Sequence, residues 1–518
     1  MFALYRKSHL MVELDRFVRG VSLVFVFSIL ANVAGMVARV LLANGYEPVV
    51  FGRIMVGYTM FSLLGTLSVW GLNTGLAYYI SREDKRSEEY RIILAAASLG
   101  LFISFIVTGT AILFNEPMVK VVFGDAALSE FTIPFLLGVP LYVCLSIVTG
   151  VFRGYESVKL KAISKDMFYN FAQIGLIATF IYLGIEGRFI GFVYVLSAAG
   201  TVVLSLSLLY KYYPPDSIQS VSVSYNRLLG DWKRMMFYST PVILLTLSNW
   251  GLNYVDTFLI QIIRGSADVG FYKAVYPLAL SLITILGSFG FLYLPTLSRL
   301  ESGGEISEAH KLYAVSTYIG FVLTVAPFLA ILFFTTEVID LLYPQSYTVA
   351  VVPLQLLSVG LFTEVVFGLN SASLNALDRT TANAVMTGLA FITNIGLNIV
   401  LIPPYGIAGA AAATAAALLL WNLLTSAWLY YTEQLHPFSV FYFKGAITTL
   451  ALTAAIYYVT GQVFAVQTLQ TRSQLGLLAA SGLLTSACNL VVLMNTLPSD
   501  VVDEISVFRR LKRIRLVD

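Results

Sequence analysis

Long apolar runs alternate with short polar stretches along almost the whole chain. Most runs are about as long as the roughly 20 residues that a helix needs to cross the hydrocarbon core of a bilayer. They cover approximately residues 20–43, 52–78, 91–114, 131–152, 167–185, 189–212, 235–262, 270–295, 312–335, 349–373, 383–402, 406–431, 440–460 and 475–495. Since lipid offers no hydrogen-bond partners, the backbone of each run must be helical. The pattern therefore predicts an all-α polytopic membrane protein with 14 transmembrane helices.

The positions of Lys and Arg predict the orientation. With both termini in the cytoplasm, the cytoplasmic segments hold roughly five times as many Lys and Arg as the outside loops. We therefore expect a multi-pass protein of the cell (cytoplasmic) membrane with both termini cytoplasmic. The basic stretch Phe508–Leu516 is interpreted as an anchor on anionic lipids, with a regulatory partner site as the alternative.

The chain contains two similar halves. Gly52 is followed six residues later by Tyr58, and Gly270 is followed six residues later by Tyr276. Because both halves begin with a span that runs outward, they are predicted to be related by a pseudo-two-fold axis along the membrane normal. The predicted divisions are an N-terminal six-helix bundle at 1–212, a cytoplasmic inter-bundle linker at 213–234, a C-terminal six-helix bundle at 235–435, helices 13 and 14 at 436–496, and a basic cytoplasmic tail at 497–518.

Composition excludes several classes of protein. Hydrophobic residues make up 58% of the chain and charged residues only 12%, which excludes a soluble multi-domain protein, a disordered chain and a secreted disulfide scaffold. A net charge of +3 gives no basis for a nucleic-acid partner. The three histidines lie in separate polar stretches, so no metal site and no cofactor are predicted.

Five charged residues lie inside or at the ends of predicted spans, where an ionisable group is costly unless it is paired or hydrated. These residues are Arg39, Arg53, Asp256, Lys273 and Glu364. They are expected to line a polar cavity between the two bundles. The alternatives are a structural ion pair between Arg39 and Asp256, a hydrogen-bonded helix contact for Glu364, and snorkelling of Arg53 and Lys273 to the membrane surface.

Asparagines accompany these charges at helical spacing. Asn32 lies seven residues before Arg39 and thus on the same helix face, and Asn249 and Asn253 share a face with Asp256. These asparagines are candidate substrate-binding residues.

No catalytic signature occurs in the sequence. A phosphate-binding loop, a zinc-protease motif and a nucleophile elbow are all missing, and the longest connection, near residues 213–234, is too short for an enzyme domain. The sequence therefore predicts a protein that is not an enzyme, whose transport is driven by an ion gradient or by the substrate gradient.

Short segments along most of the chain carry motifs of one known family. They are Ala38–Ala43 with Glu47–Gly52, Val255–Asp256 with Val269–Tyr272, Leu294–Arg299, Asn370–Asn375, Asn398, and Ile402–Ala411. The last three resemble an asparagine-bearing span and a proline–glycine turn that leads into an alanine-rich helix. Together these segments resemble the Wzx-like oligosaccharide flippases of the polysaccharide biosynthesis protein family, in the multidrug/oligosaccharidyl-lipid/polysaccharide (MOP) exporter superfamily.

The resemblance implies a fold and a function. The expected fold has two six-helix bundles around a cationic cavity, as in multidrug exporters and lipid II flippases, and its two additional C-terminal helices would form a groove for a polyprenyl tail. The implied function is to flip a lipid-linked (polyprenyl-phosphate or pyrophosphate) oligosaccharide across the cytoplasmic membrane by alternating access, for cell-surface polysaccharide or glycan synthesis.

The resemblance also implies roles for individual residues and partners. Arg39, Arg53 and Lys273 would bind the lipid pyrophosphate, and Asp256 and Glu364 would serve in gating or ion coupling. The implied partners are the substrate, membrane lipids, H⁺ or Na⁺, and other polysaccharide-assembly proteins.

Two other functions compete with this interpretation. One is a cation-coupled multidrug or small-molecule exporter of the same superfamily, for which twelve spans would be usual. The other is a non-transporting membrane scaffold or an enzyme of surface-polymer synthesis. The polar stripes within the spans argue against a scaffold, and the short connections argue against an enzyme.

Overall fold

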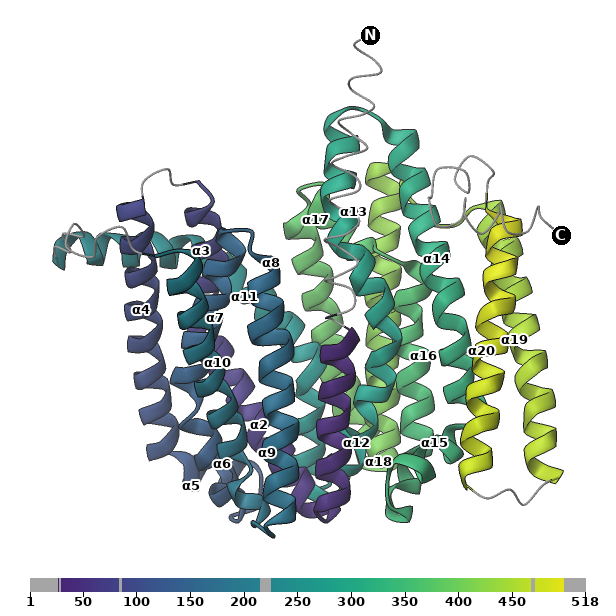
Figure 1. Cartoon of the computed structure of the whole chain (residues 1–518), viewed down its shortest axis with the longest axis horizontal. Coiled ribbons are helices and arrows are strands. Elements are labelled where there is room, and N and C mark those ends of the chain that lie inside the picture. The colour runs from purple at the N-terminus through teal and green to yellow at the C-terminus, as the bar shows by residue number, and fades with distance from the viewer. Residues whose placement is uncertain (1–26, 28, 83–85, 215–224, 467–470, 498–518) are drawn as a thin grey trace. The chain divides into compact units, whose positions relative to one another are not determined.

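The computed structural model describes residues 27, 29–82, 86–214, 225–466 and 471–497 (Figure 1). Throughout these residues the regular secondary structure is helical. Ten helices among them are long and apolar enough to cross a membrane, and Ile29–Gly45 forms a shorter apolar helix. The predicted all-α multi-pass membrane protein is thus confirmed. The basic stretch Phe508–Leu516 lies outside the described residues, as does most of the predicted N-terminal cytoplasmic segment.

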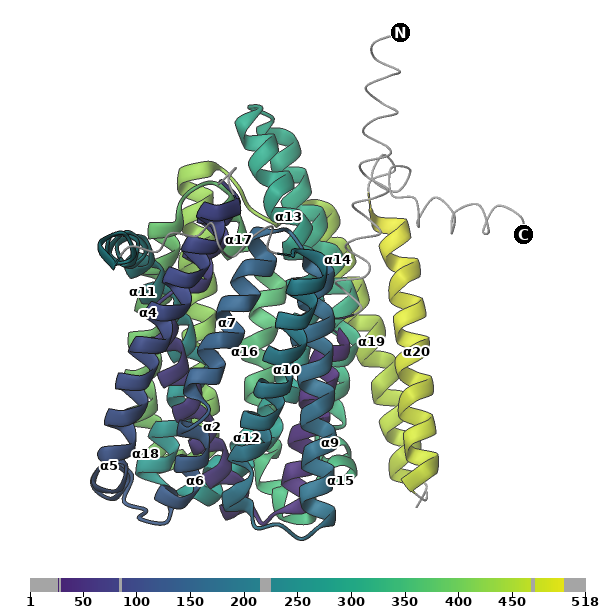
Figure 2. The same cartoon turned by 60° about the vertical axis from the view of Figure 1, so that its left-hand side comes forward.

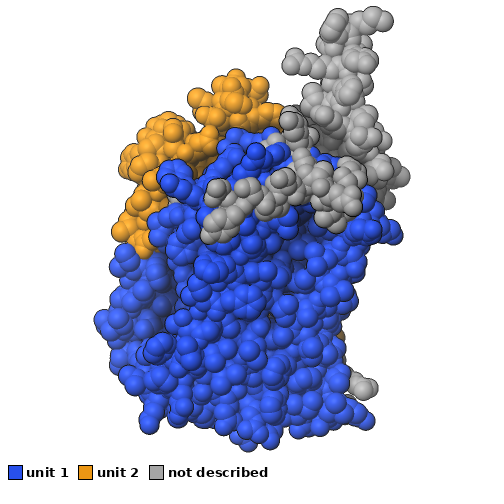
Figure 3. Space-filling view, turned by 90° about the vertical axis from the view of Figure 1, so that its left-hand side faces the viewer, with its two compact units in different colours: residues 1–277, 391–410 blue, residues 278–390, 411–518 orange. Residues whose placement is uncertain are grey.

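The chain forms two compact units, which Figure 3 colours separately. Unit one comprises residues 1–277 and 391–410, and unit two comprises residues 278–390 and 411–518. The sequence-based boundaries at 212, 235 and 435 stay predictions.

Unit one consists of the helix Ile29–Gly45 and the helices of the first half, together with α11, most of α12 and a central part of α18. Its elements are α2 (Pro48–Val69), α3 (Leu72–Ile80), α4 (Arg86–Leu113), α5 (Asn115–Val122), α6 (Leu128–Leu136), α7 (Val139–Gly154), α8 (Val158–Lys161), η1 (Ala162–Phe168), α9 (Tyr169–Tyr182), η2 (Gly187–Phe189), α10 (Gly191–Tyr212), α11 (Tyr225–Ile263), α12 (Ser266–Leu280) up to Pro277, and residues 391–410 of α18 (Thr380–Glu433).

The interior of unit one is built on α7. This helix packs against α2, α3, α4 and α10, and α9 lies beside α10 (Figures 1 and 2). Apolar side chains of α3, α4 and α7 form one buried cluster, which includes Leu72, Leu76, Ala95, Val143 and Val151. Close packing of these side chains joins α3, α4 and α7.

The second predicted span, 52–78, is two helices. α2 ends at Val69, and the following Trp70 and Gly71 both have positive φ, at 47° and 72°. Gly71 suits this left-handed conformation because it has no Cβ. The identical Trp-Gly-Leu-Asn sequence at 250–253 lies within the continuous helix α11, so it has no equivalent turn.

The first turns of α11 run across the helix bundle of unit one, whereas its later turns run along it (Figure 1). Asp231 forms a 2.9 Å salt bridge with Arg91 of α4, and the Trp232 indole N–H donates to the Ser98 hydroxyl at 3.1 Å. Residues 228–232, which fall in the connection predicted near residues 213–234, are therefore part of a helix that is bound to α4.

Helices α2 and α12 cross with their backbones in contact. A Cβ atom at Gly52 would overlap the carbonyl oxygen of Ser266, and a Cβ atom at Gly270 would overlap the carbonyl oxygen of Pro48. Only glycine permits this approach from both sides. The two glycines are the repeat-equivalent pair that the sequence analysis identified.

Unit two contains the remaining helices. Its elements are the end of α12, η4 (Ser281–Ile283), α13 (Thr284–Ser302), α14 (Ile306–Phe333), α15 (Thr335–Leu342), η5 (Gln345–Ala350), α16 (Val351–Phe367), α17 (Asn370–Ala376), residues 380–390 and 411–433 of α18, α19 (Val440–Val466) and α20 (Thr471–Thr496). Helix α14 is central, since α13, α16, α19 and α20 all pack against it.

Two glycines break helices that the sequence predicts. Gly368 has φ 71° and separates α16 from α17, within the predicted span 349–373, and its Cα lies directly against Thr317 of α14. Gly406 has φ 59° and ψ −136° and divides α18 into two helical halves after Pro403 and Pro404. The predicted proline–glycine turn at 402–406 is thus confirmed.

Candidate functional site

The first candidate site lies in unit one around the Arg39 guanidinium. The helix Ile29–Gly45 carries Arg39, and tyrosines of four other helices act on its charge electrostatically: Tyr58 of α2, Tyr194 of α10, Tyr254 of α11 and Tyr276 of α12. The ring centroid of Tyr58 lies 5.2 Å from that of Tyr194 and 6.4 Å from that of Tyr254. Arg39 therefore lies in a tyrosine-lined environment.

Lys273 of α12 shares this environment. Its ammonium lies 4.6 Å from the ring centroid of Tyr276 and 5.1 Å from that of Tyr254. It also donates to the backbone carbonyl of Asn253 at 3.3 Å, and the residue is only 4% exposed. Cation–π contacts and one carbonyl offset part of the cost of burying this charge.

The two cations have no carboxylate bound to them within the described residues. Across the part of the chain that the structure describes, neither Arg39 nor Lys273 forms a salt bridge. The Arg39 charge also acts electrostatically on Lys273. Two like charges in the same tyrosine-lined environment favour the entry of an anion.

Asp256 of α11 is fully buried next to this cluster. Its carboxylate accepts from the Tyr272 hydroxyl at 2.7 Å and from the Asn398 amide of α18 at 2.9 Å. The Asn398 amide also donates to Asn394 at 3.1 Å. Asp256 acts electrostatically on Lys273, so its charge is coupled to the cationic site.

The predicted asparagines differ in their relation to this site. Asn253 belongs to it, because its side-chain oxygen accepts from the Tyr276 hydroxyl at 3.3 Å. Asn249 lies one turn earlier in α11 and donates to the Leu245 carbonyl at 2.9 Å. Asn32 lies about two turns before Arg39 and is exposed.

Arg53 is engaged in an ion pair at the start of α2. Its guanidinium donates twice to the Asp125 carboxylate, at 2.9 and 3.2 Å. The Ser266 hydroxyl donates to the same carboxylate at 3.2 Å and to the Gln261 side-chain oxygen at 2.9 Å. This network thus joins α2 to the start of α12, beside the crossing of Gly52 and Gly270.

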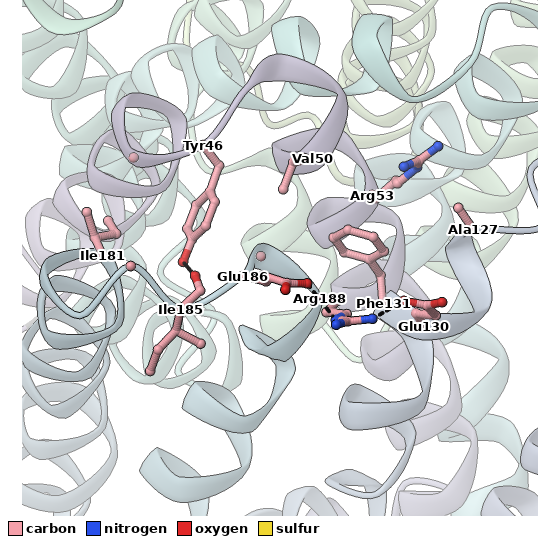
Figure 4. A pocket seen from close by; sticks show the side chains of 13 residues that line it. Tyr46, Val50, Arg53, Ala127, Glu130, Phe131, Ile181, Ile185, Glu186 and Arg188 are labelled. Atoms are coloured by element: carbon pink, nitrogen blue, oxygen red, sulfur yellow. Dashed lines mark hydrogen bonds and ion pairs between the residues drawn. The ribbon is translucent and has the colours of Figure 1, made fainter.

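A pocket of about 470 Å³ opens next to Arg53 in unit one (Figure 4). Tyr46 and Phe131 contribute aromatic rings, and the Tyr46 hydroxyl donates to the Ile185 carbonyl at 2.9 Å. Arg188 forms salt bridges of 2.8 Å with both Glu130 and Glu186. Because both arginines of this pocket are already paired with carboxylates, it offers an anion less charge than the Arg39–Lys273 site does.

Glu364 lies in unit two, so it belongs to a different environment from the other candidates. It lines a cavity of about 340 Å³ with residues of α13, α17 and α18. The structure therefore brings together Arg39, Lys273, Asp256 and Asn253 within unit one.

The tyrosines are the main functional residues that sequence reasoning missed. Tyr58 and Tyr276 were recognised as repeat markers, but not as the residues that surround Arg39 and Lys273. Their equal spacing from Gly52 and Gly270 was the available signal. Asp125 gave no such signal, because it lies in a short polar connection between apolar segments.

Comparison with known proteins identifies the family. The polysaccharide biosynthesis protein family matches residues 17–301, which is more than half of the chain. The chain belongs to this family. The predicted resemblance to the polysaccharide biosynthesis protein family is thereby confirmed.

Two curated relatives come from Haloferax volcanii. The probable low-salt glycan biosynthesis flippase Agl15 is 24% identical over 178 residues, which are 34% of this chain and 38% of Agl15. The probable flippase AglR is 24% identical over 332 residues, which are 62% of this chain and 66% of AglR. The matched segments thus span less than two thirds of either relative.

Solved structures share the fold. The lipid II flippase MurJ, in an inward closed conformation, matches with a TM-score of 0.72 and 13% identity, over 91% of this chain and 99% of MurJ. An inward-facing multidrug resistance MATE family transporter of the MOP superfamily matches with a TM-score of 0.61 and 16% identity, over 78% of this chain and 94% of that chain. At these identities the likeness concerns the fold.

Proposed function

We propose that this protein is a flippase that moves a lipid-linked oligosaccharide across the cytoplasmic membrane by alternating access, for the synthesis of a surface polysaccharide or glycan. The observation that carries this proposal is the pair of cations in unit one, the half-buried Arg39 and the buried Lys273, neither of which forms a salt bridge within the described residues. A protein that binds an anionic lipid headgroup needs such a site, and the family and the relatives Agl15 and AglR support this substrate class.

The proposed chemistry of binding follows from the side chains. The planar Arg39 guanidinium can donate two parallel hydrogen bonds to a phosphate, whereas the Lys273 ammonium acts as a point charge. The hydroxyls of Tyr58, Tyr254 and Tyr276 add neutral donors. A bound phosphate or pyrophosphate would neutralise both cations at once. Binding is favoured because the empty site holds two positive charges that no anion neutralises, whereas the loaded site does not.

We propose that the chain crosses the membrane 14 times, as two six-helix bundles and two further helices. Besides the ten long apolar helices, four elements support this count. They are Ile29–Gly45, η1 with α9, α11, and the second half of α18 beyond the break at Gly406. With both termini in the cytoplasm, Arg53, Asp125 and the crossing of Gly52 with Gly270 would lie on the outer side.

Alternating access requires that the outer side close and open in turn. In this structure α2 and α12 are held together by the Gly52–Gly270 crossing and by the Arg53–Asp125–Ser266 network. We propose that this region closes the outer side and that it separates when the headgroup leaves. Arg53 would then help to hold the outer side closed, in addition to the substrate-binding role that the family resemblance implies.

Asp256 is proposed to couple transport to H⁺ or Na⁺, whereas Glu364 is proposed to serve in gating or in coupling to H⁺. Asp256 acts electrostatically on Lys273, so its protonation, or its binding of Na⁺, would change how strongly the site attracts an anion. No cofactor is proposed, and the protein is proposed not to be an enzyme. Its partners would be the substrate, membrane lipids and other polysaccharide-assembly proteins.

A cation-coupled multidrug exporter is the second candidate, favoured by the likeness to the MATE fold. The cations Arg39 and Lys273 argue against it, because they would repel a cationic drug. Both proposals can be tested with liposomes that contain the full chain and a fluorescent polyprenyl-pyrophosphate sugar. Translocation of the lipid supports the flippase, whereas export of a cationic dye without lipid translocation would overturn it.

A further inference from the structure

The cavity in unit two differs chemically from the cationic site in unit one. It lies among α13, α16, α17 and α18 and has a volume of about 340 Å³, within the range of small-molecule sites. Its apolar wall includes Leu286, Leu294 and Leu369, and its polar groups are a carboxylate, amides, a hydroxyl and an indole. The described residues that line it include no Lys, Arg or His.

Two of its polar groups have no partner within the described part of the chain. The Trp421 indole N–H is buried and donates to no acceptor. The Glu364 carboxylate, one turn before the break at Gly368, forms neither a hydrogen bond nor a salt bridge there. The buried Trp421 donor without a partner carries a cost of about 1–3 kcal/mol, which a ligand able to satisfy it would remove. The Glu364 carboxylate is only partly buried, so it is accessible to a donor on the same ligand.

The remaining polar groups are held in fixed positions. The Asn383 amide donates to the Ser371 hydroxyl at 2.9 Å and to the Asn375 side-chain oxygen at 3.0 Å. The Asn370 amide donates to the Asn422 side-chain oxygen at 2.9 Å. These bonds fix α17 to α18 and orient Ser371 and Asn375 at the cavity wall, so the site is already formed before a ligand arrives.

We propose that this cavity binds a neutral sugar unit of the lipid-linked oligosaccharide, which rests on the function proposed above. A sugar ring presents hydroxyls that both donate and accept, together with an apolar C–H face. One hydroxyl would donate to Glu364, a neighbouring hydroxyl would accept from Trp421, and the C–H face would lie against the leucine wall. Asn375 and Ser371 would complete the hydrogen bonds around the ring.

Two observations set the class of ligand. A uronic acid is disfavoured because the cavity places its carboxylate near Glu364 with no cation among the lining residues. A bare cation is disfavoured because the side-chain oxygens of Asn370 and Asn375 already accept hydrogen bonds, and a cation cannot satisfy the Trp421 donor. A neutral ring with several hydroxyls can form hydrogen bonds with both groups that lack partners, Glu364 and Trp421.

The test is sugar binding by the full chain in nanodiscs. Methyl glucoside, methyl mannoside and N-acetylglucosamine serve as neutral probes and glucuronic acid as the charged probe, with binding followed by calorimetry and saturation-transfer NMR. We expect at least one neutral sugar to bind at least tenfold more tightly than glucuronic acid. Trp421→Phe, which keeps the ring and removes the donor, and Glu364→Gln should each weaken neutral-sugar binding about tenfold.

Matched measurements make the result decisive. Trp428→Phe, on the same helix but not at the cavity wall, should bind as the parent does, and melting curves of all variants establish that each is folded. Glu364→Gln should also reduce the preference for neutral sugar over glucuronic acid. Absence of neutral-sugar binding, binding that neither variant weakens, or binding of Na⁺ alone at Glu364 would each overturn the proposal.

The same nanodiscs separate this proposal from the flippase itself. If inorganic pyrophosphate binds in an Arg39-dependent manner and the fluorescent lipid is translocated while no sugar binds, only the sugar site is wrong. If the lipid is not translocated at all, the function proposed for the whole protein fails.

Discussion

Gly52 of α2 and Gly270 of α12, which occupy equivalent places in the two sequence repeats, lie with their backbones against each other in unit one. Each faces a carbonyl of the opposite helix, that of Ser266 for Gly52 and that of Pro48 for Gly270. The repeat thus supplies both halves of one close helix crossing, and neither half has space for a side chain.

Gly52→Ala should therefore destabilise the protein by about 1–3 kcal/mol, the usual cost of inserting a methyl group into a packed interior. It should also lower lipid translocation, because the crossing cannot re-form fully. Thermal unfolding and the liposome assay measure the two effects. Gly109→Ala in α4 is the control, since its Cβ meets no other atom within 4 Å and its melting temperature should be unchanged or higher. Equal melting temperatures for Gly52→Ala and the parent would contradict the prediction.

Replacement of Arg39 should weaken binding of inorganic pyrophosphate by about 10- to 100-fold, as expected for loss of charge-assisted hydrogen bonds. Arg39→Lys keeps the charge but loses the bidentate geometry, so it should lie between Arg39→Ala and the parent. Calorimetry on the purified full chain measures the affinities. Arg264→Ala, which removes a guanidinium that pairs with Asp268 outside the cluster, serves as the charge-matched control. If Arg39→Ala binds pyrophosphate as the parent does, Arg39 has no part in anion binding.

Asp256→Asn should abolish the dependence of translocation on the coupling ion while the protein stays folded. Asparagine has nearly the same shape and can still accept from the Tyr272 hydroxyl, but it carries no charge for H⁺ or Na⁺ to neutralise. Translocation is measured in liposomes with and without imposed H⁺ or Na⁺ gradients. An ion dependence equal to that of the parent would exclude Asp256 as the coupling group.

Arg53 and Asp125 should be coupled energetically, because they form two hydrogen bonds and their side chains are only 25% and 20% exposed. A double-mutant cycle with Arg53→Ala and Asp125→Ala should give a coupling free energy of about 1 kcal/mol. The cycle is measured by thermal or denaturant unfolding in detergent. Cysteines placed at the start of α2 and α12 should cross-link less readily in either single variant, whereas additive effects without a change in cross-linking would argue against a role in closure.

Much of the fold could be predicted from the sequence, because the lipid environment restricts a span to helix and makes each span visible as an apolar run. The proline–glycine turn near Gly406 and the amphipathic segment near Trp232 were also predictable, since each depends on local residue type. The break at Trp70–Gly71 was not predicted, because the apolar run continues through it and only the backbone dihedral angles reveal it.

The charged residues of the candidate site could be predicted from the sequence, but the residues that contact them could not. Arg39, Lys273 and Asp256 were identified because a charge within an apolar run is rare, whereas a tyrosine there is common and does not by its residue type mark a site. Contacts between segments that lie far apart in the sequence could not be predicted either. His310 and His436 lie in separate polar stretches of the sequence, yet their ring centroids are 4.4 Å apart in unit two.

Arg39 and Lys273 also affect how the protein should be handled. Two neighbouring cations that form no salt bridge within the described residues attract small phosphates in the surrounding medium, so a phosphate buffer is a competitor for this protein rather than an inert medium. Buffers such as Tris and phosphate, at equal pH and ionic strength, should therefore give different melting temperatures and different apparent affinities for the lipid.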